Sequence, residues 1–198
     1  MVAQSQTQLA PMTAEEFHAW GMMPENSEGM HELEDGRIVE VPPSKQLHGV
    51  VCFLLAHLLG KYLVPRGGYL MTNDTGLIVK RRPDTVRGPD IMAFLVRPAF
   101  DELKAEYVED TPDLVAEVLS PTDRPGKNNK RINQYLARGI PLIWVIDPED
   151  RNMIVYSQNG VSKTLDESDE LSGTDTLPDF SCKVADFFSW PTASTATP

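Results

Sequence analysis

The stretch that decides the fold is DLVAEVLSPTDRPGKNNKRINQYLARGIPLIWVIDP, residues 113–148. An apolar run over 114–119 is followed by a turn with proline and glycine, then by a segment at 126–138 that predicts a helix. The apolar run LIWVID comes next and ends at Pro148. A strand, a helix and a second strand in this order form the crossover unit that builds parallel sheets. The stretch therefore predicts an α/β domain.

Glu117 stands inside the first apolar run. Removing an unpaired, ionised carboxylate from water costs at least several kcal/mol. A metal ion, a basic side chain or a raised pKa must therefore compensate. Because side chains alternate between the two faces of a strand, Val115, Glu117 and Leu119 are expected on the same face.

A second carboxylate, Asp90, begins the predicted strand DIMAFLV at 90–96, and open α/β sheets place their sites at strand ends. Two acids from neighbouring strands could share a divalent ion. A structural ion pair between Glu117 and Lys127 or Lys130 is the alternative that the residues themselves leave open.

The remaining segments surround this unit. Thr13 and Glu16 have the spacing of a capping box before a short helix that Gly21 ends. Asp35-Gly36 predicts a tight hairpin turn in HELEDGRIVEV. Apolar residues at three- and four-residue intervals predict a long helix over 45–63. A second hairpin is expected from GYLMTN and GLIVK (68–80), an edge strand from MIVYS (153–157) and a short helix from VADFF (184–188).

Composition limits the classes of function. The 198 residues, 41% of them hydrophobic and 24% charged, suit one domain over 12–190 with flexible ends at 1–11 and 191–198. A net charge of −11 excludes a broadly basic nucleic-acid surface, so a nucleic-acid partner must meet a local patch. Cys52 and Cys182 lack the spacing of a zinc site or a disulfide framework. No signal-peptide pattern and no apolar run of about eighteen residues is apparent, so we expect a cytoplasmic protein without membrane contact.

Six blocks resemble, in order, those of the Uma-two type family of bacterial endonucleases in the PD-(D/E)XK superfamily. They are EEFHAW, HELEDGRIVEVPPSKQLHG, GPDIMAF, DLVAEVLSPTDR, YLARGIPLIWVIDPEDRNMIVY and LPDFSCKVADFF. The resemblance implies a restriction-endonuclease-like α/β fold, a mixed central sheet flanked by helices with an N-terminal hairpin. It also implies a Mg²⁺-dependent endonuclease, Mn²⁺ being an alternative ion, that hydrolyses phosphodiester bonds by metal-activated water.

The resemblance also assigns roles to residues. Asp90 and Glu117 would be catalytic ligands of Mg²⁺, together with the carbonyl of Val118. The superfamily lysine, expected two residues after the acid, is Leu119 here. The family takes this lysine from the next helix, where alignment on Tyr135 puts Arg131 in the lysine position. We expect the neighbouring Lys130 to be catalytic, with four auxiliary residues, Glu32, His48, Lys127 and Arg131.

The basic stretch KRRPDTVRGPD leads into Asp90 and predicts phosphate contacts from Lys80, Arg81, Arg82 and Arg87. The expected partner is nucleic acid, with DNA preferred, and the fold suggests a homodimer by analogy. Two alternatives remain. One is a catalytically inactive nuclease-like domain that binds nucleic acid or protein, suggested by Leu119 and Arg131. The other is a metal-dependent hydrolase of a small phosphorylated substrate, which suits an acidic protein.

Overall fold

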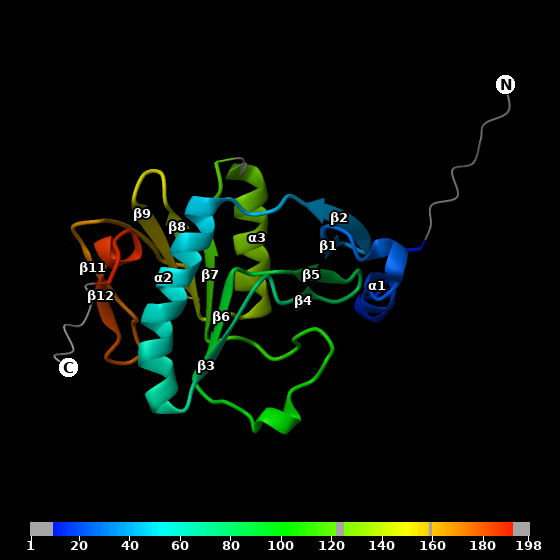
Figure 1. Ribbon diagram of the computed structural model, residues 1–198, viewed down its shortest axis with the longest axis horizontal. Coiled ribbons are helices and arrows are strands. Elements are labelled where there is room, and N and C mark those ends of the chain that lie inside the picture. Colours follow the sequence, from blue (N-terminus) through cyan, green and yellow to red (C-terminus); the bar gives the residue numbers. More distant parts are fainter. Residues whose placement is uncertain (1–9, 122–124, 159, 192–198) are drawn as a thin grey trace, which may run out of the picture.

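Two sheets form the framework of the protein, whose computed structural model describes residues 10–121, 125–158 and 160–191. The larger, six-stranded sheet has the order β10-β9-β8-β7-β6-β3, and the smaller, four-stranded sheet has the order β2-β1-β5-β4. Figure 1 shows the two sheets side by side, with helices α2 and α3 beside the larger one. The termini predicted to be flexible, 1–11 and 191–198, lie almost wholly outside the described residues.

The crossover predicted from residues 113–148 is confirmed. Strand β7 (Leu114–Val118) runs parallel to β8 (Leu142–Asp147), and α3 (Pro125–Arg138) connects them. The other pairings in the larger sheet are antiparallel and involve β3 (Tyr69–Thr72), β6 (Ile91–Phe94), β9 (Asn152–Ser157) and β10 (Ser162–Asp166). The mixed α/β sheet expected from the sequence is therefore present.

The two faces of the larger sheet have separate apolar cores, as the alternation of side chains requires. Ala116, Trp144 and their neighbours pack against α2 (Gln46–Leu63) and against the C-terminal elements. Those elements are β11 (Glu170–Ser172), β12 (Ser181–Lys183) and the 3₁₀ segment η4 (Val184–Phe187). On the opposite face, Val115 and Ile143 pack against Tyr135 of α3. Glu117 has the parity of Val115 and lies on this second face, as predicted.

The smaller sheet carries the N-terminal helix. Helix α1 (Ala14–Gly21) has the predicted capping box, in which the Thr13 hydroxyl accepts a hydrogen bond from Glu16 N. Strands β1 (Met30–Glu34) and β2 (Arg37–Val41) form the predicted hairpin. Asp35 and Gly36 both have positive φ, 49° and 76°, which a tight hairpin turn requires. The sheet is completed by β4 (Leu77–Lys80) and β5 (Thr85–Arg87).

The second predicted hairpin, over residues 68–80, is wrong. Strand β3 pairs with β6 in the larger sheet, whereas β4 pairs with β5 in the smaller one. Residues 73–76 therefore carry the chain from one sheet to the other. Turn residues indicate a reversal of the chain, but the partner of each strand depends on contacts distant in sequence.

The prediction that MIVYS is an edge strand is also wrong, because β9 lies between β8 and β10. Strand β10 has the sequence SKTLD, in which only Leu165 is buried, so it shows no apolar alternation. The final helix is present as the 3₁₀ segment η4. Within the described part of the chain, three further 3₁₀ segments connect the larger elements: η1 (Pro24–Asn26), η2 (Val64–Arg66) and η3 (Phe100–Glu102).

Helix α2 corrects one further expectation. Residues Gln46–Arg66 are long and apolar enough to cross a membrane by length and composition, contrary to the interpretation of the sequence. Such helices are also found as core helices of globular domains. Leu55, Leu59 and Leu63 are fully buried against the larger sheet, so this face of the helix belongs to the core.

Candidate active site

Asp90 and Glu117 lie at the ends of neighbouring strands. Strand β6 pairs with β7 in antiparallel register, and Ile91 is opposite Ala116. One step further along the same register brings Asp90 to the level of Glu117. The backbone N–H of Val118 donates a hydrogen bond of 2.7 Å to Asp90 Oδ2. The two acids predicted from separate motifs are thus brought together by strand pairing.

Helix α3 supplies the partners of Glu117. The Arg131 guanidinium lies 3.1 Å from Glu117 Oε1, and the buried Tyr135 hydroxyl donates a hydrogen bond to the same oxygen. Among the described residues, the other oxygen, Oε2, accepts no hydrogen bond. A basic side chain and a hydroxyl therefore stabilise this carboxylate, and one of its oxygens remains available to a ligand.

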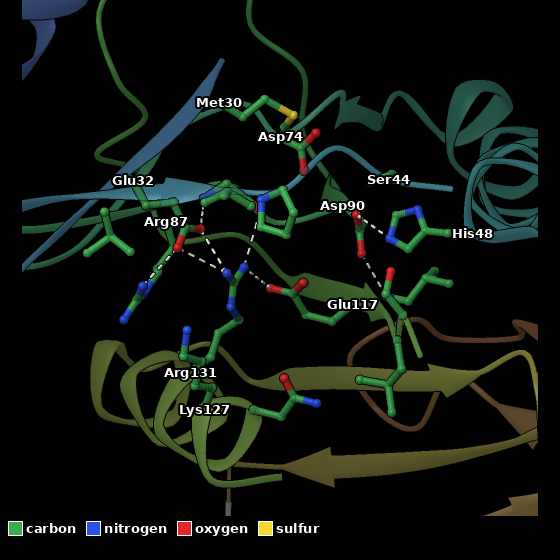
Figure 2. Close-up of a pocket in the computed structure, with 18 of the residues that line it drawn as sticks. Met30, Glu32, Ser44, His48, Asp74, Arg87, Asp90, Glu117, Lys127 and Arg131 are labelled. Atoms are coloured by element: carbon green, nitrogen blue, oxygen red, sulfur yellow. Dashed lines mark hydrogen bonds and ion pairs between the residues drawn. The ribbon is translucent and has the colours of Figure 1, made fainter. Parts of the chain in front are cut away.

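Arg131 also contacts Glu32 of strand β1. Its Nη2 atom lies 2.9 Å and 3.0 Å from the two carboxylate oxygens of Glu32. Glu32 further accepts hydrogen bonds from Arg87 Nη1 (2.8 Å) and from the backbone N–H of Gly88 (2.9 Å). Arg131 therefore connects α3 to both sheets through Glu117 and Glu32, and its position between these acids is visible in Figure 2.

His48, in the first turn of α2, contacts the other acid. Its Nε2 atom lies 3.1 Å from Asp90 Oδ1, and its Nδ1 atom lies 3.5 Å from the sulfur of Cys52. The hydrogen bond to Asp90 raises the pKa of His48, although burial acts in the opposite direction. Asp90 thus has one oxygen on a histidine and the other on the backbone of β7.

These groups line a cavity of about 670 Å³ between the two sheets. Its walls come from the β1–β2 hairpin, the starts of α2 and α3, the 73–76 segment and the ends of β6 and β7. Figure 2 shows the carboxylates of Asp74, Asp90 and Glu117 around this space, with Lys127 at the α3 side. A smaller cavity of about 380 Å³ adjoins it and shares His48, Asp74 and Asp90.

Burial and mutual repulsion affect the acids of the cavity. Burial raises the pKa of Glu117 to about 7, opposed by the charge of Arg131 and reinforced by that of Asp90. Burial also raises the pKa of Asp74, and the negative charge of Asp90 raises it further. A cation bound among these acids would reduce the repulsion between their carboxylates and favour their ionised forms.

The predicted cations occupy different places. Lys127 is exposed at the cavity, whereas the Lys130 ammonium contacts Glu34 and lies 3.5 Å from Asp35. Lys130 therefore has no contact with Glu117 or Asp90; Arg131 has the contact with Glu117.

The predicted phosphate contacts are dispersed. Arg87 is buried and bound to Glu32 and Glu34. Lys80 pairs with Asp35, and Arg81 contacts three acids, Glu15, Asp84 and Glu109. Arg82 is exposed in the β4–β5 turn. Arg87 therefore belongs to the interior network rather than to a basic rim, because its buried charge requires carboxylate partners.

Sequence reasoning missed Asp74, Tyr135 and Lys45 as residues of this site. Tyr135 could have been found, because it follows Arg131 by four residues and therefore shares a helix face with it. Lys45 directly precedes α2 and lines the cavity. Asp74 stands in a segment whose residues are typical of a turn, and no local pattern indicated that this segment crosses from one sheet to the other.

The donors fit a hard divalent cation. Carboxylate oxygens are the ligands that Mg²⁺ prefers, and Mg²⁺ usually keeps several waters, for which the cavity has room. Glu117 Oε2 accepts no hydrogen bond among the described residues, whereas Asp90 Oδ1 contacts His48 Nε2 and Asp90 Oδ2 accepts from the Val118 N–H. His48, Cys52 and Asp90 also bring their donor atoms within 4.8 Å of one another.

Comparisons with known proteins agree with this architecture. The solved structure of "a putative nuclease belonging to DUF820 from Anabaena variabilis ATCC 29413" superposes with a TM-score of 0.76. It is 23% identical, and the alignment covers 91% of this chain and 99% of that one, which shows a common fold. No curated protein gives a significant match. The profile of the family described as "Uma2: Putative restriction endonuclease" matches residues 14–185. The site therefore lies within the matched region, and the chain belongs to the Uma2 family.

Proposed function

We propose that the protein is a Mg²⁺-dependent endonuclease, able to use Mn²⁺, that hydrolyses phosphodiester bonds of DNA. The observation that carries the proposal is the pair of acids, Asp90 and Glu117, at adjacent strand ends in one cavity. Among the described residues, Glu117 Oε2 accepts no hydrogen bond, and Asp90 is held by the Val118 N–H on one oxygen and by the His48 imidazole on the other. Family membership supports the same reaction class.

In this proposal Asp90 and Glu117 hold the ion, with the carbonyl of Val118 as a third donor. A divalent ion bound there supplies Lewis acidity and makes water a nucleophile at neutral pH. The contact between His48 and Asp90 fixes the orientation of the carboxylate and puts an ionisable imidazole beside the site. Arg131 offsets negative charge that develops on the phosphate, because its guanidinium lies beside Glu117 and remains protonated.

Phosphate contacts are assigned to Lys45 and Lys127. Both are exposed, both line the cavity, and neither has a carboxylate partner among the described residues. They precede or begin the helices α2 and α3, whose N-termini carry partial positive charge. A local basic patch of this kind reconciles nucleic-acid binding with a net charge of −11. Cleavage of both DNA strands would require two such sites, which a homodimer would provide.

The test is plasmid cleavage with purified protein, Mg²⁺ or Mn²⁺, and the variants Asp90→Ala and Glu117→Gln. We expect metal-dependent nicking that both substitutions abolish while the variants remain folded. Cleavage that persists in either variant, or that proceeds in excess chelator, would contradict the proposal.

One observation favours a second candidate, a nuclease-like domain that binds nucleic acid without cutting it. Arg131 already neutralises Glu117, so the ion must compete with a fixed guanidinium. Calorimetric titration with Mg²⁺ distinguishes the two functions: folded protein that binds DNA but no ion would be a binding domain.

A further inference from the structure

Among the cavity acids that are at least partly buried, Asp74 has the least support from other side chains. Asp90 contacts His48, Glu117 contacts Arg131 and Tyr135, and Glu32 contacts two arginines. No hydrogen bond or ion pair of the Asp74 carboxylate is found within residues 10–121, 125–158 and 160–191. Burial of an ionised carboxylate without a partner raises the free energy of the folded protein. A cation bound beside Asp74 would lower it.

The strand register explains why Asp74 reaches the site. Thr72, the last residue of β3, is opposite Ile91, the first residue of β6. Residues 73 and 74 therefore follow β3 at the level where Asp90 precedes β6. Asp74 lines both cavities together with Asp90 and His48. Figure 2 shows its carboxylate on the same side of the cavity as Asp90.

The backbone around Asp74 is held in an uncommon conformation. Asn73 and Asp74 have φ of 65° and 53°, in the left-handed region that few non-glycine residues adopt. The Thr75 hydroxyl donates a hydrogen bond of 2.7 Å to Thr72 O, which fixes the turn. Such backbone conformations are concentrated at ligand sites, where contacts with the surrounding structure hold them in place.

Gly88 makes the close approach of this turn possible. A Cβ at residue 88 would lie 2.8 Å from the carbonyl oxygen of Asp74 and 3.0 Å from its Cβ. Gly88 also donates its N–H to Glu32 and accepts a hydrogen bond from Arg131. The same glycine therefore lets the Asp74 turn pack beside the network that holds Glu117.

We propose that Asp74 is the third carboxylate of the metal site, acting with Asp90 and Glu117, and that Gly88 positions it. This inference rests on the function proposed above. Three carboxylates from three adjacent strand ends, β3, β6 and β7, would surround the ion on one side and leave the cavity side to water and phosphate. In this proposal the 73–76 segment supplies a metal ligand in addition to connecting the two sheets.

The test measures Mn²⁺ binding by calorimetry and by electron paramagnetic resonance, without nucleic acid. Asp74→Asn is expected to weaken binding by about tenfold or more. Glu40→Gln is the matched control, because Glu40 is an exposed residue of β2 that lines the same cavity. The substitution removes the same charge as Asp74→Asn. A carboxylate that acts only through its charge would give similar small losses in both variants, and this result would overturn the inference.

A double-mutant comparison tests the role of Gly88. Gly88→Ala should displace the turn and weaken Mn²⁺ binding. The double variant Gly88→Ala/Asp74→Asn should lose little more Mn²⁺ affinity than either single variant does. Thermal melting of each variant verifies that it is folded. Additive losses would contradict the positioning role of Gly88.

Separate outcomes distinguish the inference from the proposed function. If Asp90→Asn loses Mn²⁺ and Asp74→Asn binds it as the wild type does, the inference fails while the metal site at Asp90 and Glu117 stands. If the folded wild-type protein binds no Mn²⁺, both fail.

Discussion

Arg131 Nη1 lies 3.1 Å from Glu117 Oε1, and this contact explains how a carboxylate exists inside an apolar strand. Of the compensations that a buried acid allows, two operate together here. A guanidinium pairs with Glu117, and burial still raises the pKa of Glu117 to about 7. A metal ion would be a third compensation, and it would compete with Arg131 for the same carboxylate.

Replacing Arg131 tests this competition. Arg131→Lys leaves one point charge where a planar group contacted two acids, so Glu117 should become more available to an ion. We expect Mn²⁺ affinity to increase a few-fold by calorimetry. Arg131→Ala should instead destabilise the fold by about 3 kcal/mol, because it leaves buried charge unpaired. Denaturant unfolding measures this loss, and an Arg131→Ala variant as stable as the wild type would show that the Arg131 contacts are weak.

Glu117→Gln tests the raised pKa through stability of the metal-free protein. Because the pKa of Glu117 rises on folding from 4.5 to about 7, its favourable contribution is complete below pH 4.5 and is lost as the pH rises through 7. Relative to Glu117→Gln, the wild type should therefore lose roughly 3 kcal/mol between pH 4.5 and pH 8. Urea unfolding of both proteins across this range, in chelator, gives the difference. A difference that does not depend on pH would contradict the shift.

Lys130→Ala tests whether this lysine of α3 takes part in catalysis. The Lys130 side chain is 47% exposed and contacts Glu34 at the surface, so its removal should cost less than about 1 kcal/mol. We expect it to change Mn²⁺ affinity little and to slow cleavage less than Arg131→Ala does. Single-turnover cleavage provides the comparison. A complete loss of cleavage in Lys130→Ala, with metal binding intact, would restore Lys130 as the catalytic cation expected from the sequence.

Lys45 and Lys127 are assigned to phosphate contacts, and salt dependence tests each of them. Removing one phosphate contact should reduce the slope of log K against log salt by about one. Lys45→Ala and Lys127→Ala should each do so in DNA-binding titrations performed with Ca²⁺. Arg82→Ala is the control, because Arg82 is exposed in the β4–β5 turn and absent from the cavity walls. An effect in Arg82→Ala alone would instead support the basic rim predicted from residues 80–87.

Tyr135→Phe isolates the hydroxyl on Glu117. The hydrogen bond from Tyr135 lowers the pKa of Glu117, against the larger effect of burial. Its loss should therefore raise that pKa and shift Mn²⁺ binding toward higher pH, with a small loss of stability of about 1 kcal/mol. Calorimetric titrations at several pH values measure the shift. An unchanged pH profile would mean that Tyr135 only fills the core.

The sequence by itself determined the elements whose signals are local. The apolar runs around 126–138 predicted the β7-α3-β8 crossover, the Thr13 capping box predicted α1, and Asp35-Gly36 predicted the first hairpin. Glu117 was also found from sequence, because it is a carboxylate inside an apolar run, and Asp90 was found from its place at the start of a strand together with the family resemblance. Their catalytic roles stay a prediction.

Only the tertiary structure decided which distant segments meet. The turn at 73–76 resembled that of a hairpin, yet β3 and β4 join different sheets, and this crossing puts Asp74 beside Asp90. Likewise, Lys130 and Arg131 are neighbours in sequence, but successive helical residues point about 100° apart. Arg131 therefore contacts Glu117 while Lys130 contacts Glu34. Strand partners and helix faces depend on packing between segments distant in sequence, and no local pattern specifies them.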